Sequence, residues 1–208
     1  MSSSKKGKKP STSKSKKFFP VFSYFGYIFL ACGLVIFGLT FFPVFKEEVK
    51  YLVNNKKTTG IIPVDREFGI VIPKIKANAK IISNVDPYNA DAYQKALTRG
   101  VAHASGTAFP GHAGNSFLFA HSSVDWYVAN RYNSVFYLIN KLEQGDKIEA
   151  YYLGKKYTYE VFDKLTVGPE DVSYLDPGTS GDSATLTLMT CWPPGTSVKR
   201  LIIKAKII

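Results

Sequence analysis

Short apolar runs separated by turn signals fill residues 67–208. The runs are rich in β-branched and aromatic residues, which is typical of strands. They predict strands at Phe68–Ile72, Lys80–Ser83, Asn115–Ala120, Lys147–Leu153, Lys156–Thr166, Ala184–Thr190 and Lys199–Lys206. Helical periodicity is limited to Ala90–Leu97 and Ser134–Leu142, and Leu153-Gly154-Lys155 indicates a hairpin turn. Tyr157, Tyr159 and Val161 alternate with polar residues, as on a half-buried strand. Seven or eight strands at these spacings predict a mainly β domain, either a closed barrel or a sandwich.

An uncharged apolar run, residues 18–45, precedes this domain. As a helix rising about 1.5 Å per residue, roughly 20 of its residues would cross a hydrocarbon core of ~30 Å. Pro20 suits the first turn of such a helix and Pro43 suits its end. A cleaved signal peptide has a shorter apolar region, about 7–15 residues, and a small-residue cleavage site, which this run lacks. We therefore expect a retained transmembrane helix at 18–45.

The net charge of +11 is concentrated ahead of the apolar run. Residues 1–17 hold seven lysines and no acid, and without them 20 basic residues face 16 acidic ones. Because lysines gather on the cytoplasmic side of membrane segments, we expect a disordered cytoplasmic tail at 1–17. Residues 46–66 would then be an extracytoplasmic stalk, and residues 67–208 a folded domain outside a cell membrane crossed once. The tail would lie near anionic lipid, so we expect no nucleic-acid partner.

The cysteines and their neighbours supply the first candidate chemistry. Two cysteines exclude a disulfide-rich scaffold, and Cys32 lies within the apolar run, so Cys191 has no partner in its own domain. It follows the apolar strand Ala184–Thr190 and precedes Trp192-Pro-Pro-Gly, so it should lie at a strand end. The alternative is that Cys191 is an ordinary buried cysteine with no chemical role. A free thiol has a pKa of about 8.5 and needs a nearby cation to become a nucleophile near neutral pH. Arg200 begins the next strand, and a hairpin would return it beside Cys191.

Three histidines are candidates for the general base. His103 and His112 lie in a glycine-rich segment, 100–114, that has the texture of a loop. His121 ends the apolar strand that begins near Asn115, so it occupies the same kind of position as Cys191. Strand ends hold side chains in fixed geometry, which favours His121.

These residues resemble the signature of the sortase family. Thr187-Leu188-Met189-Thr190-Cys191, followed by Trp-Pro and then by Arg200, is similar to the family's TLxTC motif with its downstream arginine. Gly114–His121 is similar to the sortase strand that ends at the active-site histidine, although Ala120 stands where the family often has glycine. The resemblance covers roughly residues 67–208, and the GTAFPG…GN segment leans toward class D or E.

The resemblance implies an eight-stranded β-barrel with one or two short helices and a cysteine transpeptidase activity. Cys191 would attack a backbone carbonyl of an LPxTG-type sorting signal and form a thioacyl enzyme, which an amine of a bacterial cell-wall precursor or of a pilin would resolve. His121 would be the general acid and base, and Arg200 would bind substrate and stabilise the tetrahedral intermediate. Thr190 would contribute to substrate binding or to the oxyanion site.

The pattern of histidines and acids does not predict a metal site or a cofactor. The three histidines are nine residues apart, which is not a ligand spacing. Because some sortases use calcium, five acids in turns are candidate ligands: Asp86, Glu143, Asp146, Glu170 and Asp171. Acids in turns are more often simply solvated.

Two other functions use the same features. An L,D-transpeptidase or cysteine peptidase acting directly on peptidoglycan would also use cysteine and histidine, but the Ser-His-Gly-Cys style of motif is missing from the sequence. A non-catalytic anchored barrel that binds surface partners would leave Cys191 inert.

Overall fold

The computed structural model describes residues 19–54, 60–122, 135–175 and 183–208. The chain divides into two units, residues 1–42 and 43–208, and each is described by itself. Ser134, the first residue of the helix expected at 134–142, lies outside the described residues.

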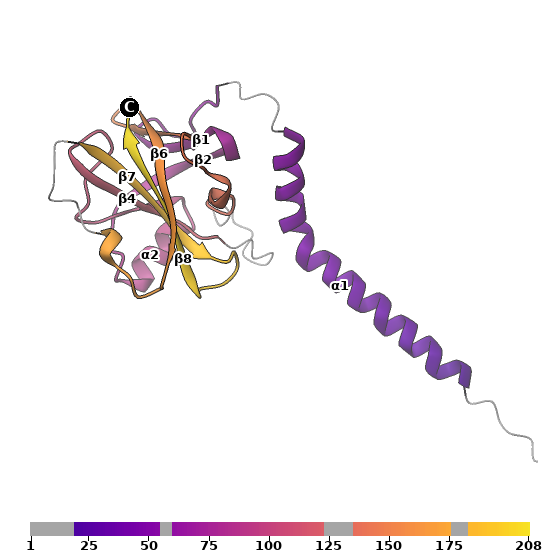
Figure 1. The fold of residues 1–208 in the computed structure, drawn as a ribbon. Helices are drawn as coiled ribbons and strands as arrows, with labels where there is room; N and C mark the ends of the chain where they lie inside the picture. The colour runs from indigo at the N-terminus through magenta and orange to yellow at the C-terminus, as the bar shows by residue number, and fades with distance from the viewer. Residues whose placement is uncertain (1–18, 55–59, 123–134, 176–182) are drawn as a thin grey trace, which may run out of the picture. The chain divides into compact units, whose positions relative to one another are not determined.

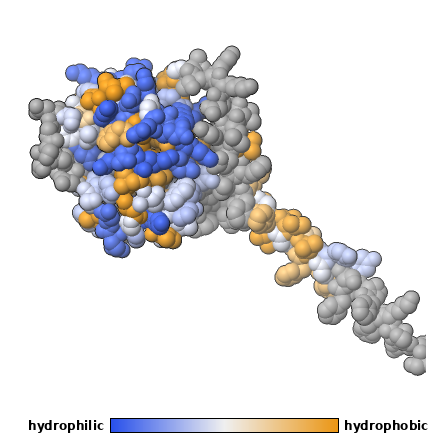
Figure 2. All heavy atoms as spheres, in the orientation of Figure 1, coloured by the Kyte–Doolittle hydropathy of each residue, from blue (hydrophilic) through white to orange (hydrophobic). Residues whose placement is uncertain are grey.

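Helix α1 (Phe19–Asn54) contains nearly all of the uncharged run. Large apolar side chains are exposed along its described part, among them Phe25, Phe29 and Leu34. Figure 2 shows hydrophobic residues, in orange, along part of the helix. The sequence suggested that Pro43 ends this helix, but the helix continues past it to Asn54. Glutamate, lysine and leucine, which favour helix, follow it, and an internal proline weakens a helix without always ending it.

In α1 the structure describes the side chains at 24–39, 42 and 49. Within the described residues, no helix is both long enough and apolar enough to cross a membrane.

Eight strands form a closed barrel, which decides between the barrel and the sandwich (Figure 1). Their order around the barrel is β1-β2-β3-β4-β7-β8-β6-β5. The strands are β1 (Phe68–Ile72), β2 (Ala77–Val85), β3 (Val101–Ala104), β4 (Gly114–Phe119), β5 (Lys147–Tyr152), β6 (Lys155–Val167), β7 (Ala184–Trp192) and β8 (Lys199–Ile207). The helical elements beside them are α2 (Ala90–Leu97) and the 3₁₀ turns η1 (Pro73–Ile75), η3 (Ile139–Lys141) and η4 (Ser173–Leu175).

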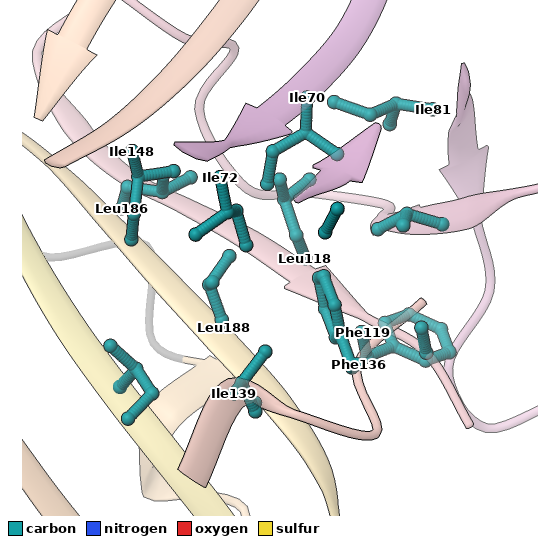
Figure 3. Close-up of a cluster of buried hydrophobic side chains, with 14 of the residues drawn as sticks. Ile70, Ile72, Ile81, Leu118, Phe119, Phe136, Ile139, Ile148, Leu186 and Leu188 are labelled. Carbon is teal, nitrogen blue, oxygen red and sulfur yellow. The ribbon is translucent and has the colours of Figure 1, made fainter. Parts of the chain in front are cut away.

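The alternation of side chains builds the core. Ile70 and Ile72 of β1, Leu186 and Leu188 of β7, and Ile148 of β5 are fully buried and meet inside the barrel (Figure 3). Side chains two apart on a strand share a face, so each strand places one face in this core. The same rule holds on β6, where Tyr159 and Val161 are buried as their alternation predicted.

The hairpin between β5 and β6 also agrees with the sequence. Tyr152 pairs with Lys155, so Leu153 and Gly154 form a two-residue turn. Both have positive φ, 50° and 76°, as the tightest hairpin turn requires.

Strand β3 was not predicted, and His103 within it was wrongly placed in a loop. The strand has only four residues, all buried, and it pairs with β2 and β4. Because all four are buried, they show no polar–apolar alternation, and the glycines on either side are typical of a loop. The helix expected at 134–142 is reduced, among the described residues, to the short turn η3.

Candidate active site

The three residues expected to carry the chemistry come from three adjacent strands. β4 and β7 are parallel neighbours whose last paired residues are Phe119 and Met189. His121 and Cys191 each follow these residues by two positions, at the same edge of the barrel. Because neighbouring strands lie about 4.8 Å apart, the two backbones are within side-chain reach.

The β7–β8 hairpin brings the arginine to the same place. Cys191 pairs directly with Arg200 across the antiparallel ladder, as the hairpin argument predicted. Residues directly opposite in such a pair have their side chains on one face, with Cβ atoms about 4.5–5.5 Å apart. Cys191 is the second-last residue of β7, is half-buried and forms no disulfide.

Arg200 is held by the backbone of its own hairpin. Its Nη1 donates to the carbonyl oxygens of Ser197 at 3.0 Å and Lys199 at 3.2 Å. A guanidinium carries five N–H donors in a rigid fork, so the side chain is fixed in place by one nitrogen while the group keeps further donors for a substrate oxygen.

Thr190 stabilises the end of β4. It is buried, with 2% of its surface exposed, and its hydroxyl donates to the carbonyl oxygen of Ala120 at 2.8 Å. The Ala120 amide in turn donates to the Met189 carbonyl at 3.2 Å. The residue just before His121 is thus bonded twice to the strand of the cysteine.

His121 is also bonded from the helix side. Its Nε2 lies 3.1 Å from Oε1 of Gln94, which belongs to α2. Gln94 was not among the residues predicted from the sequence, because helical periodicity places it only on an exposed face and does not indicate which strand end the helix meets.

A single cavity of about 530 Å³ joins these groups. His121, Thr190, Cys191 and Arg200 all line it, and so does Gln94. Its other walls are mainly apolar and aromatic, from the loop before α2, from α2, from β4 and from the connection after β6: Pro87, Tyr88, Tyr93, Leu97, Phe117, Phe119, Ala120, Pro169, Val172, Tyr174, Leu175 and Met189. Ser122 lines it as well, and its buried hydroxyl has no hydrogen-bond partner among the described residues.

The other two histidines lie outside this cavity. His103 is fully buried, its Nδ1 accepts from the Asn84 amide at 3.4 Å, and its Nε2 lies 3.0 Å from the Ala108 carbonyl oxygen. Burial lowers the pKa of His103, so it is a neutral structural residue. His112 is exposed in the turn before β4, as expected for a loop histidine.

The acids considered as calcium ligands do not form a metal site among the described residues. Glu143 and Asp146 both bond the ammonium of Lys74, at 2.9 and 2.8 Å. The hydrogen bond and charge of Lys74 lower the pKa of Glu143. Asp171 accepts from the hydroxyl and amide of Ser173 at 2.6 and 3.1 Å, so it stabilises η4.

Comparison with known proteins agrees with the fold. A family model for the sortase domain matches residues 70–208. The chain is 32% identical to Sortase SrtE1 of Streptomyces coelicolor over 168 residues, which is 74% of this chain and 44% of that protein. It is 29% identical to Sortase D of Bacillus subtilis over 164 residues, or 77% and 71% of the two chains. These two names agree with the lean toward classes D and E.

A solved structure shows the same fold. Sortase C from Clostridium perfringens, solved with the C-terminal cell wall sorting motif, has a TM-score of 0.56 and 26% identity, and the match covers 78% of this chain and 84% of that one. The chain thus spans less than half the length of SrtE1 and most of the length of the sortase C chain. The matched family domain, the eight-stranded barrel and the strand-end cysteine, histidine and arginine show that this chain belongs to the sortase family.

Proposed function

We propose that this chain is a cysteine transpeptidase that cleaves an LPxTG-type sorting signal and transfers the cleaved protein to an amine. Sortases are cysteine transpeptidases, and the observation that carries the proposal is the cavity lined jointly by His121, Cys191 and Arg200. Its aromatic and apolar walls suit an extended, partly apolar peptide.

In the first step, the Cys191 thiol gives its proton to His121, and its sulfur bonds to a backbone carbonyl carbon of the sorting signal. The C–N bond on the glycine side then breaks, and His121 gives a proton to the departing amine. The negative charge that forms on the carbonyl oxygen is stabilised by Arg200.

In the second step, an acceptor amine attacks the thioacyl carbon and gives a proton to His121. A new amide forms and the Cys191 thiolate leaves. A cell-wall precursor or a pilin lysine has the required amine, and the acceptor decides between wall anchoring and pilus assembly.

The proposal includes a membrane anchor at residues 18–45, with the tail of residues 1–17 inside the cell and the domain of residues 67–208 outside. It is supported by the 28 uncharged residues of the run and by the seven lysines ahead of it. A tethered enzyme shares the membrane surface with an anchored substrate, which raises the effective concentration of both.

Mass spectrometry of the full-length chain tests the activity. Incubation with an LPxTG-type peptide should add the N-terminal fragment to Cys191, and an added amine should release it as a new amide. Cys32→Ala should behave like the wild type, whereas Cys191→Ala should form no adduct. Adducts formed only with muropeptides would favour the peptidoglycan enzyme, and no adduct with either would favour the non-catalytic barrel.

Protease protection tests the anchor. In intact cells, external protease should reach residues 67–208 and leave an epitope on residues 1–17 intact. Cleavage of the epitope, or release of the whole chain from the membrane by salt, would contradict the proposed topology.

A further inference from the structure

We propose that Gln94 is a positioning residue that holds the ring of His121 through catalysis, an inference that rests on the proposed function. The 3.1 Å between Oε1 of Gln94 and Nε2 of His121 is a hydrogen-bond distance. Oε1 only accepts, so the bond places a proton on Nε2. The proton exchange with thiol and substrate then takes place at Nδ1.

This bond does not depend on the charge of the histidine. Nε2 carries a proton in the neutral tautomer that Gln94 selects and also in the imidazolium. The ring can therefore gain and lose its second proton, at Nδ1, without breaking the bond or turning. An activated nucleophile and its base are commonly completed by a third group that orients the base, and Gln94 is placed to be that group.

Helix α2 gives Gln94 a fixed position. Asn89 caps the helix by accepting from the Ala92 amide at 3.1 Å. Leu97 is buried in the core, with 4% of its surface exposed. The Tyr93 ring meets the Phe119 ring edge-on, with centroids 6.4 Å apart. The residue before Gln94 thus packs against the strand that ends just before His121.

The two ends of His121 are then fixed by different parts of the fold. Its backbone follows Ala120, which β7 holds through Thr190. Its ring is bonded from α2, which packs on β2 and β3. The bond from Gln94 thus acts on the ring, and the bond from Thr190 acts on the backbone just before it.

The side chain of Gln94 is a neutral amide rather than a carboxylate, and this affects the charge beside His121. An amide oxygen orients the ring and adds no charge, whereas a carboxylate would stabilise the imidazolium and raise the pKa of His121. Among the described residues, the charged or titratable groups that face the same cavity are Cys191, Arg200, Asp171 and the three tyrosines Tyr88, Tyr93 and Tyr174. These groups are unchanged in a variant at position 94, so a change in the pKa of His121 in that variant is due to the replacement of Gln94.

Nitrogen NMR of the full-length chain labelled at histidine tests the proposal. His121→Gln assigns the signals. Wild type should show the Nε2–H tautomer for His121, and Gln94→Leu should show a mixture of both tautomers. Gln94→Glu should keep the tautomer and raise the pKa of His121. Lys95→Ala, on an exposed face of the same helix, should leave both unchanged.

Kinetics supply the second measurement. Gln94→Leu should lower kcat about 10- to 100-fold with little change in KM, because misdirecting a catalytic group slows chemistry more than binding. Gln94→Glu should recover much of kcat and move the pH–rate profile to higher pH. An unchanged tautomer and an unchanged kcat in Gln94→Leu would overturn the inference.

The outcomes separate this inference from the proposed function. If wild type forms no peptide adduct, the proposed function fails, and the NMR result still decides whether Gln94 orients His121. If wild type is active and the Gln94 variants match it in tautomer, pKa and kcat, the inference alone fails. Circular dichroism of each variant shows that α2 is retained.

Discussion

Thr190→Val removes one hydroxyl from the buried contact between β7 and β4 and changes little else. Valine has nearly the shape of threonine, so the core is neither emptied nor overfilled. What is lost is the 2.8 Å bond to the Ala120 carbonyl oxygen, at a site where Thr190 is only 2% exposed. A buried acceptor that loses its donor costs about 1–3 kcal/mol, more than the roughly 1 kcal/mol of an average hydrogen bond.

We therefore expect the free energy of unfolding of the barrel unit to fall by about 1–2 kcal/mol, which lowers Tm by roughly 2–8 °C. Urea unfolding of the full-length chain, followed by tryptophan fluorescence, measures it. Since the bond holds the residue before His121, kcat should also fall while KM stays close to the wild-type value. Thr190→Ser keeps the hydroxyl and serves as the matched control, with a smaller loss from the missing methyl group.

The opposite pattern would refute this reasoning. If Thr190→Val unfolds at the wild-type urea concentration and instead raises KM, the hydroxyl contacts the substrate, as the family resemblance implied, and does not stabilise β4. A loss of stability in Thr190→Ser with none in Thr190→Val would show that the methyl group, which valine keeps, matters and the hydrogen bond does not.

Three further perturbations have expected outcomes. Burial lowers the pKa of His103, so the unfolded chain binds more protons than the folded one at acidic pH. Tm measured by differential scanning calorimetry should therefore be constant above about pH 6.5 and fall below it, and Tm of His103→Gln should depend less on pH. Arg200→Lys keeps the charge but loses the fork of donors, and we expect a loss of about 10²-fold in kcat by peptide cleavage, whereas wild-type activity would contradict a role in stabilising the intermediate. Treatment with EGTA should leave activity unchanged, because Lys74 already bonds Glu143 and Asp146, and a calcium-dependent rate would show another site.

The strands could be predicted where local pattern and local contacts agree. The β5–β6 hairpin depends on Leu153-Gly154 and on alternation at Tyr159 and Val161, all within one short stretch. The pairing of Cys191 with Arg200 likewise follows from a hairpin between sequential strands. In both places the residues that interact are close in the chain, so the sequence pattern contains most of the information.

Long-range contacts could not be predicted in the same way. The parallel pairing of β4 with β7 joins Ala120 to Thr190, 70 residues away, and no periodicity reports it. The strand-end position of His121 favoured it as the base, and the resemblance to a known family implied the same role, but neither showed that β4 and β7 are neighbours. Gln94 was not predicted for the same reason, since its bond to His121 depends on where α2 meets the end of β4.

The reactive groups and the wall of the cavity come largely from different parts of the fold, so the wall can change while the reactive groups stay in place. Its reactive groups stand at strand ends whose registers are set by the barrel, whereas much of the wall comes from α2 and from the connection after β6. Replacing or lengthening that connection would change which peptide fits, while the cysteine, its base and the arginine keep their spacing. A swap of segment 168–175 between relatives is therefore a direct route to altered peptide preference in an engineered ligase.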